Sequence, residues 1–337
     1  MKITPSWTAT FETNVQTFIV DAWARTQKDL IWDKLMDVRP SATLRELYFW
    51  LVESAKISTE GQGGNKRYDD LAATFFEIDN VNSGNALMLT KNEIEDNMMA
   101  GPLLRGMPVL DYAANWAKQI GGAGAYWPQD QLFNTLIPNG ATTNGYDGVA
   151  FFSTAHPINP VLGASGGTYS NIATGGSALP LLITTGATTG AGSVWTAAAN
   201  LNTAVSNMRS LKQANGKMRR LRPRHLFHDP SLQYSVNQLL DSKFFGATDN
   251  VFTRLGIEPV CVDELSANPG IWYLTAELMP GEGGPFIYQD REPYYLSSYA
   301  ADSQVELQRR KDFEWLYDGR NAAWYGHPYL ISQNCPT

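Results

Sequence analysis

Residues 71–97 have the sequence LAATFFEIDNVNSGNALMLTKNEIEDN, and the interpretation of the whole chain starts from this stretch. Two runs typical of β-strands, 71–79 and 86–90, flank the turn-forming residues Asn82, Ser83 and Gly84. The pattern predicts a β-hairpin. Because an isolated two-stranded hairpin is barely stable in water, we expect it to project from the body and pack against something else.

Outside this stretch, the spacing of apolar residues predicts helices over 11–36, 109–120, 194–212 and 229–240, with Gly121 and Gly122 ending the second of them. Strand candidates lie at 225–227, 260–262, 271–275, 286–288 and 305–307. Residues 139–191 are rich in Gly, Thr and Ser, which predicts a long loop. Helices and strands mix without a regular βαβ alternation, so the predicted fold class is α+β.

The composition is that of a folded globular protein, because 43% of the 337 residues are hydrophobic and 18% are charged. A formal net charge of −7 argues against a protein that grips nucleic acid over its whole surface. The two cysteines, Cys261 and Cys335, make no disulfide framework and fit a reducing cytoplasm. No apolar run approaches the roughly 20 residues that span a bilayer.

A hydrolase is the enzymatic alternative, and it would use Ser153, His156 and Asp147. Three such residues within a short segment are common by chance, and the members of a triad usually come from separate segments. We therefore favour a locally bonded loop histidine and expect no catalytic residue. His225 and His228 could bind a metal ion together with Asp229, but their spacing suits one ion poorly and no third strong ligand is close. His327 is expected to be at the surface or in packing, so no metal ion or cofactor is expected.

A basic cluster stands between the third helix and the following strand. Such a cluster can contact phosphate, although a solvated linker is the interpretation that the sequence alone favours. Its members are Lys217, Arg219, Arg220, Arg222 and Arg224.

Several segments, in order along the chain, carry a resemblance to a known family. The sharpest is YDGVAFFSTAHP at 146–157. The other matching segments are 48–51 (YFWL), 75–80 (FFEIDN) leading into 87–97 (LMLTKNEIEDN), 285–291 (PFIYQDR) and 319–326 (GRNAAWYG). Together they resemble the major head subunit family of Mu-like phages and prophages, whereas residues 163–192 and the tail after Tyr329 match poorly.

The resemblance implies an HK97-type capsid fold. Residues 1–57 would form an N-terminal arm and 58–97 an extended hairpin, the E-loop. Residues 98–138 and 291–337 would form the peripheral domain with its long spine helix, and 139–290 the axial domain. No N-terminal maturation cleavage is expected.

The resemblance also implies the function: a major capsid protein that assembles as pentamers and hexamers into an icosahedral head around double-stranded DNA, held without sequence specificity. Portal and scaffold proteins are expected partners, a decoration protein is left open, and no membrane partner is expected. Assembly would take place in the host cytoplasm and the product would be the virion. A nanocompartment (encapsulin-like) shell protein shares this fold and is the nearer alternative.

Contacts between subunits are expected from two regions. From the E-loop we expect Lys66, Arg67, Phe75, Phe76, Ile78, Leu87 and Leu89. From the arm we expect Trp23, Trp32, Tyr48 and Trp50. Lys66 alone is weak evidence for a covalent crosslink, so none is expected.

Overall fold

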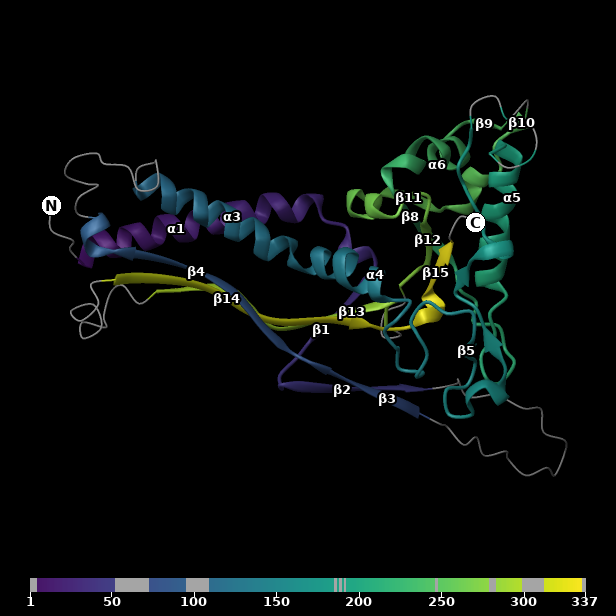
Figure 1. Cartoon of the computed structure of the whole chain (residues 1–337), viewed down its shortest axis with the longest axis horizontal. Coiled ribbons are helices and arrows are strands. Elements are labelled where there is room, and N and C mark those ends of the chain that lie inside the picture. Colours follow the sequence, from purple (N-terminus) through teal and green to yellow (C-terminus); the bar gives the residue numbers. More distant parts are fainter. Residues whose placement is uncertain are drawn as a thin grey trace, which may run out of the picture.

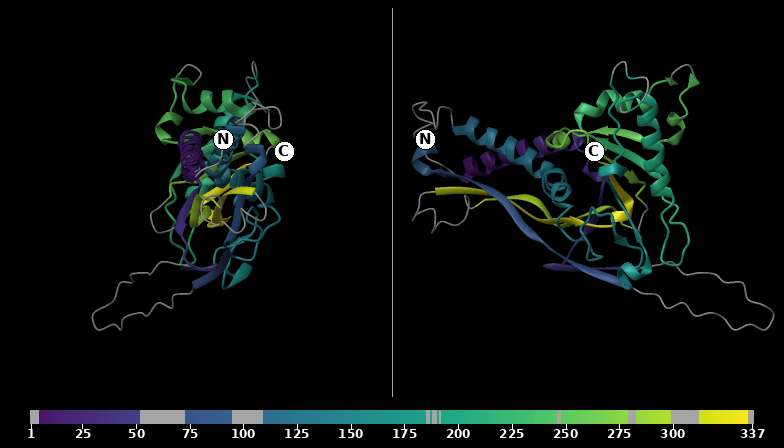
Figure 2. Two further views of the ribbon diagram at one scale, coloured as in Figure 1. Left: turned by 90° about the vertical axis from the view of Figure 1, so that its left-hand side faces the viewer. Right: turned by 45° about the vertical axis from the view of Figure 1, so that its right-hand side comes forward.

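The computed structural model describes residues 5–51, 73–94, 109–184, 187, 190, 192–245, 248–278, 283–298 and 312–334. An elongated part carries two long helices over a four-stranded sheet, and a more compact part is built around a five-stranded sheet (Figure 1). A two-stranded ribbon leaves the elongated part on the side of the sheet opposite the helices (Figures 1 and 2). No helix among the described residues is long and apolar enough to cross a membrane.

The elongated part is held together by one sheet face and the two helices that cover it. Its strands are, in order, β1 (Met36–Pro40), β13 (Phe286–Ser298), β14 (Asp312–Tyr325) and β4 (Val81–Thr90), with only β1 and β13 parallel. Helices α1 (Pro5–Thr26) and α3 (Val109–Asp130) pack on this sheet. Their shared core contains Phe11, Val15, Ile19, Leu87, Leu89, Ile94, Ala113, Ala117, Phe313, Trp315 and Tyr317.

The predicted helix end at Gly121 and Gly122 was wrong, because α3 continues through both residues to Asp130. It then runs into a π-helix (Gln131–Leu136) and a short α4 (Ile137–Asn139). Gly121 lies where α3 meets the backbone of α1, so the missing side chain allows close helix packing.

The compact part contains the helices and strands that the sequence predicted most accurately. Its sheet has the order β11 (Glu258–Cys261), β8 (Pro223–His228), β12 (Trp272–Ala276), β15 (Ile331–Asn334) and β7 (Ile172–Ala173). Helices α5 (Val194–Arg209) and α6 (Gln233–Leu240) pack their apolar residues together with those of this sheet in one hydrophobic core. Strand β15 lies within 291–337, which was predicted to belong to the peripheral domain. It pairs with β12 and β7 and so belongs to the sheet of the compact part.

The remaining elements are short, and several of them lie in the predicted long loop. They are 3-10 turns at Gln27–Asp29, Trp32–Lys34, Gly163–Gly166, Gly175–Ser177, Pro230–Leu232, Phe252–Leu255, Asp263–Ala267 and Pro328–Leu330, and the strands β5 (His156–Pro157), β6 (Thr168–Tyr169), β9 (Phe244–Phe245) and β10 (Thr248–Asp249).

The predicted hairpin between 71–79 and 86–90 was wrong, because these two strands do not pair with each other. Strand β3 (Ala73–Asp79) pairs with β2 (Arg45–Leu51), whereas β4 pairs with β14. The predicted turn at 82–84 was therefore wrong, and these residues lie within β4. Gly84 is opposite Asp318, where a Cβ would be 2.6 Å from the Tyr317 carbonyl oxygen, so its lack of a side chain serves strand packing and not a turn.

Candidate intersubunit surface

The β2–β3 ribbon has one covered face. Residues directly opposite each other in an antiparallel pair point to the same side, and Tyr48 is opposite Phe76. Their rings stack with centroids 5.4 Å apart. Tyr48 and Ile78 are buried, and they pack with Ile287 of β13 in a small cluster. This face therefore anchors the ribbon to its own subunit.

The opposite face, which we name the outer ribbon face, is formed by Leu47, Phe49 and Phe75 and is open to solvent. These side chains are 48%, 69% and 60% exposed. The rings of Phe49 and Phe75 are cross-strand neighbours with centroids 6.2 Å apart. Three large apolar side chains on one side of a narrow ribbon form a surface that is typical of a protein–protein contact.

The ribbon base is fixed by a carboxylate. Oε1 of Glu46 accepts hydrogen bonds from the backbone nitrogens of Ala42 (2.8 Å) and Thr43 (3.0 Å) and from the hydroxyl of Ser41 (2.9 Å). These bonds to the charged form, those from the backbone first, lower the pKa of Glu46 to about 2. The turn that precedes β2 is thereby held in one conformation.

A second set of bonds joins both strands to the body. The side-chain amide of Asn80, between β3 and β4, donates to the Thr43 carbonyl and to Oγ of Ser41, each at 2.8 Å. The Tyr48 hydroxyl lies 3.1 Å from Oε1 of Gln289 on β13. The direction in which the ribbon leaves the sheet is therefore set within the chain.

A hollow of about 590 Å³ adjoins the outer ribbon face. Arg45 and Asp79 of the ribbon line it, with Trp127 of α3 and Trp324 of β14 on its other side. Val81 and Trp324 are 59% and 39% exposed. The hollow therefore lies at the base of the ribbon, where the charged residues Arg45, Glu77 and Asp79 stand on the same side of the ribbon as Phe75.

Some predicted intersubunit contacts are corrected by the structure. Ile78, Leu87 and Leu89 are at most 3% exposed within the single chain, because the four-stranded sheet and its helices cover them. They are core residues, and the prediction that a neighbour buries them was wrong. Phe75 is exposed and Phe76 is half-buried, so their predicted contacts with a neighbour stay predictions. Lys66 and Arg67 lie outside the described residues.

Three of the aromatic residues predicted for the arm, Trp23, Trp32 and Tyr48, already have ring partners in their own chain. Trp23 lies 6.2 Å from Tyr294, between ring centroids, and Trp32 packs edge-on against Tyr288 at 5.2 Å. Trp50 is opposite Thr74 in the ribbon. An intersubunit role for Trp23, Trp32 and Trp50 stays a prediction.

His156 and Asp147 come together, but without Ser153. Nδ1 of His156 lies 2.6 Å from Oδ2 of Asp147, and both side chains are buried. Nε2 of His156 contacts the Phe151 carbonyl and Oδ1 of Asn171, each at 3.1 Å, so no hydroxyl lies in the position of a nucleophile. Oγ of Ser153 instead accepts from the Ala155 backbone. The arrangement ties a loop together and does not form a triad.

The other histidines also have local partners. Nδ1 of His228 lies 2.8 Å from the carbonyl oxygen of Asp229, and His225 lies 3.5 Å from Glu258. Burial lowers the pKa of both histidines. His327 is buried and packs edge-on against Tyr146. Among the described residues no three His, Cys, Asp or Glu side chains are grouped so that they could hold a metal ion.

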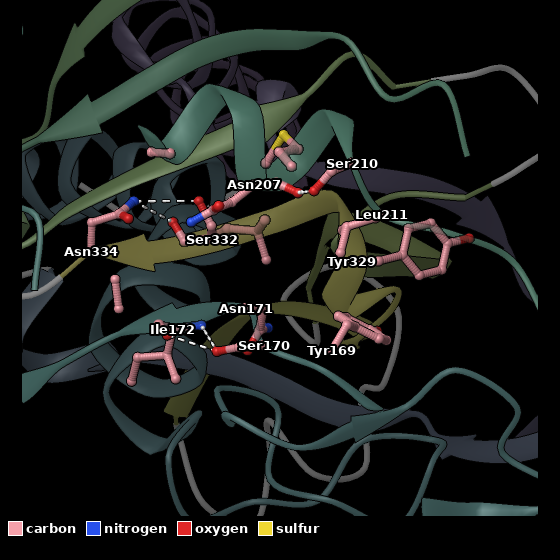
Figure 3. Close-up of a pocket in the computed structure, with 14 residues that line it drawn as sticks. Tyr169, Ser170, Asn171, Ile172, Asn207, Ser210, Leu211, Tyr329, Ser332 and Asn334 are labelled. Atoms are coloured by element: carbon pink, nitrogen blue, oxygen red, sulfur yellow. Dashed lines mark hydrogen bonds between the residues drawn. The ribbon is translucent and has the colours of Figure 1, made fainter. Parts of the chain in front are cut away.

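A pocket of about 360 Å³ opens between the end of α5 and strands β15 and β7 (Figure 3). Its polar lining residues include Asn207 in the last turn of α5, Ser210 just after it, Ser332 and Asn334 of β15, and Asn171 beside β7. The lining contains amides, hydroxyls, aliphatic groups and the rings of Tyr169 and Tyr329, but no His, Asp, Glu, Lys, Arg or Cys side chain.

The predicted basic cluster follows α5 and extends into β8, which contains Arg224. Lys217, Arg220, Arg222 and Arg224 are exposed, and Arg219 is half-buried.

Sequence reasoning missed two residues of the outer ribbon face, Leu47 and Phe49. The continuous apolar run LYFWL (47–51) does not show which of its residues face outward, so their exposure follows only from the pairing of β2 with β3.

Comparison with known proteins gives two family matches. The model of the Mu-like prophage major head subunit gpT matches residues 9–187, and the model of the phage capsid protein family matches residues 110–323. No curated protein matches the chain.

Solved structures share the fold at low sequence identity. The capsid of bacteriophage JBD30 is 18% identical, with a TM-score of 0.53, over 70% of this chain and 91% of that one. The capsid of cyanophage P-SCSP1u is 15% identical, with a TM-score of 0.53, over 91% and 88%. The mature capsid of bacteriophage PhiM1 is 10% identical, with a TM-score of 0.51, over 91% and 87%.

Proposed function

Because the chain belongs to the Mu-like prophage major head subunit family and is a structural protein of the phage capsid, we propose that its outer ribbon face holds neighbouring subunits of the shell together. In the shell, Leu47, Phe49 and Phe75 of one copy would lie against a second copy. The adjoining hollow, with Trp324 at its edge, would receive part of that neighbour.

The exposed face of the ribbon is the observation that supports this proposal. The inner face already anchors the ribbon through Tyr48 and Ile78, so the outer face is free for a neighbour. Full burial of a large apolar side chain contributes roughly 1.5–3 kcal/mol, and three such side chains recur at every equivalent contact of a shell. Arg45 and its ion-pair partners Glu77 and Asp79 would form the polar rim.

Family membership and symmetry support a proposal for the larger assembly. We propose pentamers and hexamers that close into an icosahedral head around double-stranded DNA, with assembly in the host cytoplasm. A closed shell requires one surface to meet several neighbours in nearly equivalent environments, which a projecting ribbon allows. Portal and scaffold proteins would be further partners. In the family's terms the ribbon would be the E-loop, α3 would be the spine helix, and the compact part would be the axial domain.

The test is the double variant Phe49→Asp/Phe75→Asp. We expect soluble, folded subunits that no longer form particles in negative-stain electron microscopy and size-exclusion chromatography, because two buried carboxylates would oppose the contact. The matched control is Phe49→Leu/Phe75→Leu, which keeps the face apolar and should still assemble.

Intact particles from the Asp variant would show that this face does not hold the shell together. Circular dichroism of the free subunits separates an assembly defect from unfolding. The inner-face residue Phe76 is a poorer target, because its stacking on Tyr48 supports the ribbon itself.

A further inference from the structure

The segment 209–224 is strongly basic on an acidic protein. It holds seven Lys and Arg residues and no Asp or Glu, whereas the rest of the chain has 19 Lys and Arg against 33 Asp and Glu. We name it the basic hairpin. Positive charge this dense produces a local positive potential even though the net charge is −7.

The basic hairpin is a folded turn and not a loose linker. Lys212 and Met218 form a β-bridge, and the backbone nitrogen of Arg219 donates to the Leu211 carbonyl at 2.9 Å. The Arg219 guanidinium lies 3.9 Å from the centre of the Tyr329 ring. A stacked arginine and a closed turn keep the cations in fixed positions relative to the five-stranded sheet.

The backbone directs the arginines outward. Arg220 has a φ of 57°, which costs energy for a residue other than glycine. The next residue, Leu221, is buried, while Arg222 and Arg224 are exposed. Residues two apart in an extended segment point to the same side, so Arg222 and Arg224 form a row on the surface.

Part of this charge is not neutralised within the chain. In the portion that the structure describes, neither Arg220 nor Arg222 forms an ion pair, and Arg224 donates to the carbonyl of Gly256 and not to a carboxylate. Neighbouring like charges repel each other, so a bound polyanion would stabilise the arrangement.

We propose that the basic hairpin binds the phosphate backbone of the nucleic acid enclosed by the shell. The inference rests on the proposed function, in which the shell encloses double-stranded DNA. A second copy of this chain is the weaker candidate: no stretch of 16 residues in the sequence holds more than four carboxylates, about half the charge required. A phosphate backbone supplies one negative charge for about every 1.7 Å of duplex axis and needs no matching sequence.

The probe for the test is a fluorescein-labelled DNA duplex of about 30 base pairs, titrated with full-length unassembled subunits between about 50 and 200 mM KCl. Fluorescence anisotropy reports the affinity and its salt dependence. The variant Arg220→Gln/Arg222→Gln/Arg224→Gln should bind at least about tenfold more weakly at low salt. Its slope of log K against log [KCl] should be shallower by about 2 to 3, since each lost phosphate contact removes about 0.9.

The matched control removes the same charge elsewhere. Arg25→Gln/Lys28→Gln/Arg254→Gln changes three exposed cations outside the hairpin and should leave the affinity and the slope within about twofold of the unmodified chain. An equal loss in both triple variants would overturn the proposal, because the effect would then come from net charge alone.

Two further outcomes overturn the proposal. If the hairpin variant binds DNA as the unmodified chain does, the site does not bind phosphate. If it binds DNA normally and fails to form particles, the hairpin contacts a second copy instead. The proposed shell function is tested separately, because failure of the unmodified chain to form particles would leave the DNA titration of free subunits interpretable.

Discussion

Gly121 of α3 lies directly against the backbone of Ile19 in α1: a Cβ at position 121 would be 2.4 Å from the Ile19 carbonyl oxygen. Gly122, the next residue, has only the hydroxyl of Thr26 nearby, 3.2 Å from the corresponding position. Two adjacent glycines in one helix therefore face different constraints. The first sets how closely the two helices pack, and the second does not.

The first prediction follows from this pair. Gly121→Ala should lower the free energy of unfolding by about 1–3 kcal/mol, because the helices must move apart. Gly122→Ala should be neutral or stabilise by up to about 1 kcal/mol, since alanine is the better helix former. Urea denaturation measures both, and equal effects of the two substitutions would show that the close crossing does not determine packing.

The second prediction concerns the ribbon base. Glu46→Gln should destabilise the subunit by about 1–2 kcal/mol near neutral pH, because a neutral amide accepts the backbone hydrogen bonds less strongly. Glu77→Gln is the control. It disturbs only an exposed ion pair with Arg45 and should cost less than about 1 kcal/mol.

The pH dependence of the Glu46 effect has a definite sign. The pKa of Glu46 is lowered from 4.5 to about 2, so its contribution is fully present above pH 4.5 and is lost as the pH falls towards 2. The difference between Glu46→Gln and the unmodified chain should shrink over that range. A difference that stays constant would mean that the ionised carboxylate is not what holds the turn.

The third prediction concerns His228, whose side chain is fully buried. Burial lowers its pKa from 6.5, so folding favours the neutral ring, and stability should fall as the pH drops below 6.5. His228→Asn keeps a donor for the Asp229 carbonyl and removes the titrating group. The unfolding midpoint of this variant should change less between about pH 7.5 and pH 5.5 than that of the unmodified chain.

Part of the slope should remain in the His228→Asn variant. The pKa of His225 is also lowered, first by burial, and this residue still titrates. Identical slopes in the variant and the unmodified chain would exclude His228 as a source of acid sensitivity.

The fourth prediction separates structure from catalysis at His156. His156→Ala leaves the buried Asp147 carboxylate without its ring partner and should cost about 3 kcal/mol or more. Adding Asp147→Ala should recover part of this loss, so the two substitutions should be non-additive in a double-mutant cycle. A hydrolytic activity that disappears with His156→Ala would revive the enzymatic alternative.

Sequence reasoning succeeded where the information is local. The compact part contains α5, α6, β8 and β12 close to their predicted positions, because the apolar residues of each follow the period of its own helix or strand. A sequence-local signal does not identify a strand's partner. Asn82, Ser83 and Gly84 have turn propensity, but pairing with β14 over the full length of β4 overrides it.

The same limit applies to the candidate surface. Phe75 was identified as a contact residue, but Leu87 and Leu89 were grouped with it because they share its apolar character. Which of them is free depends on the strand that each one faces, and β2 was not expected to pair with β3. The partner Phe49 becomes visible only after the register of these two strands is known.

The continuity of β3 and β4 has a mechanical consequence. Only Asn80 separates the two strands, so a pull on the ribbon is transmitted along the chain axis into β4. Residues 81–90 pair in unbroken antiparallel register with residues 312–321 of β14. Hydrogen bonds in such a ladder lie perpendicular to the strands, so this pull stresses them together in shear and does not open them one at a time. Outward pressure on a shell would therefore be resisted by the entire ladder.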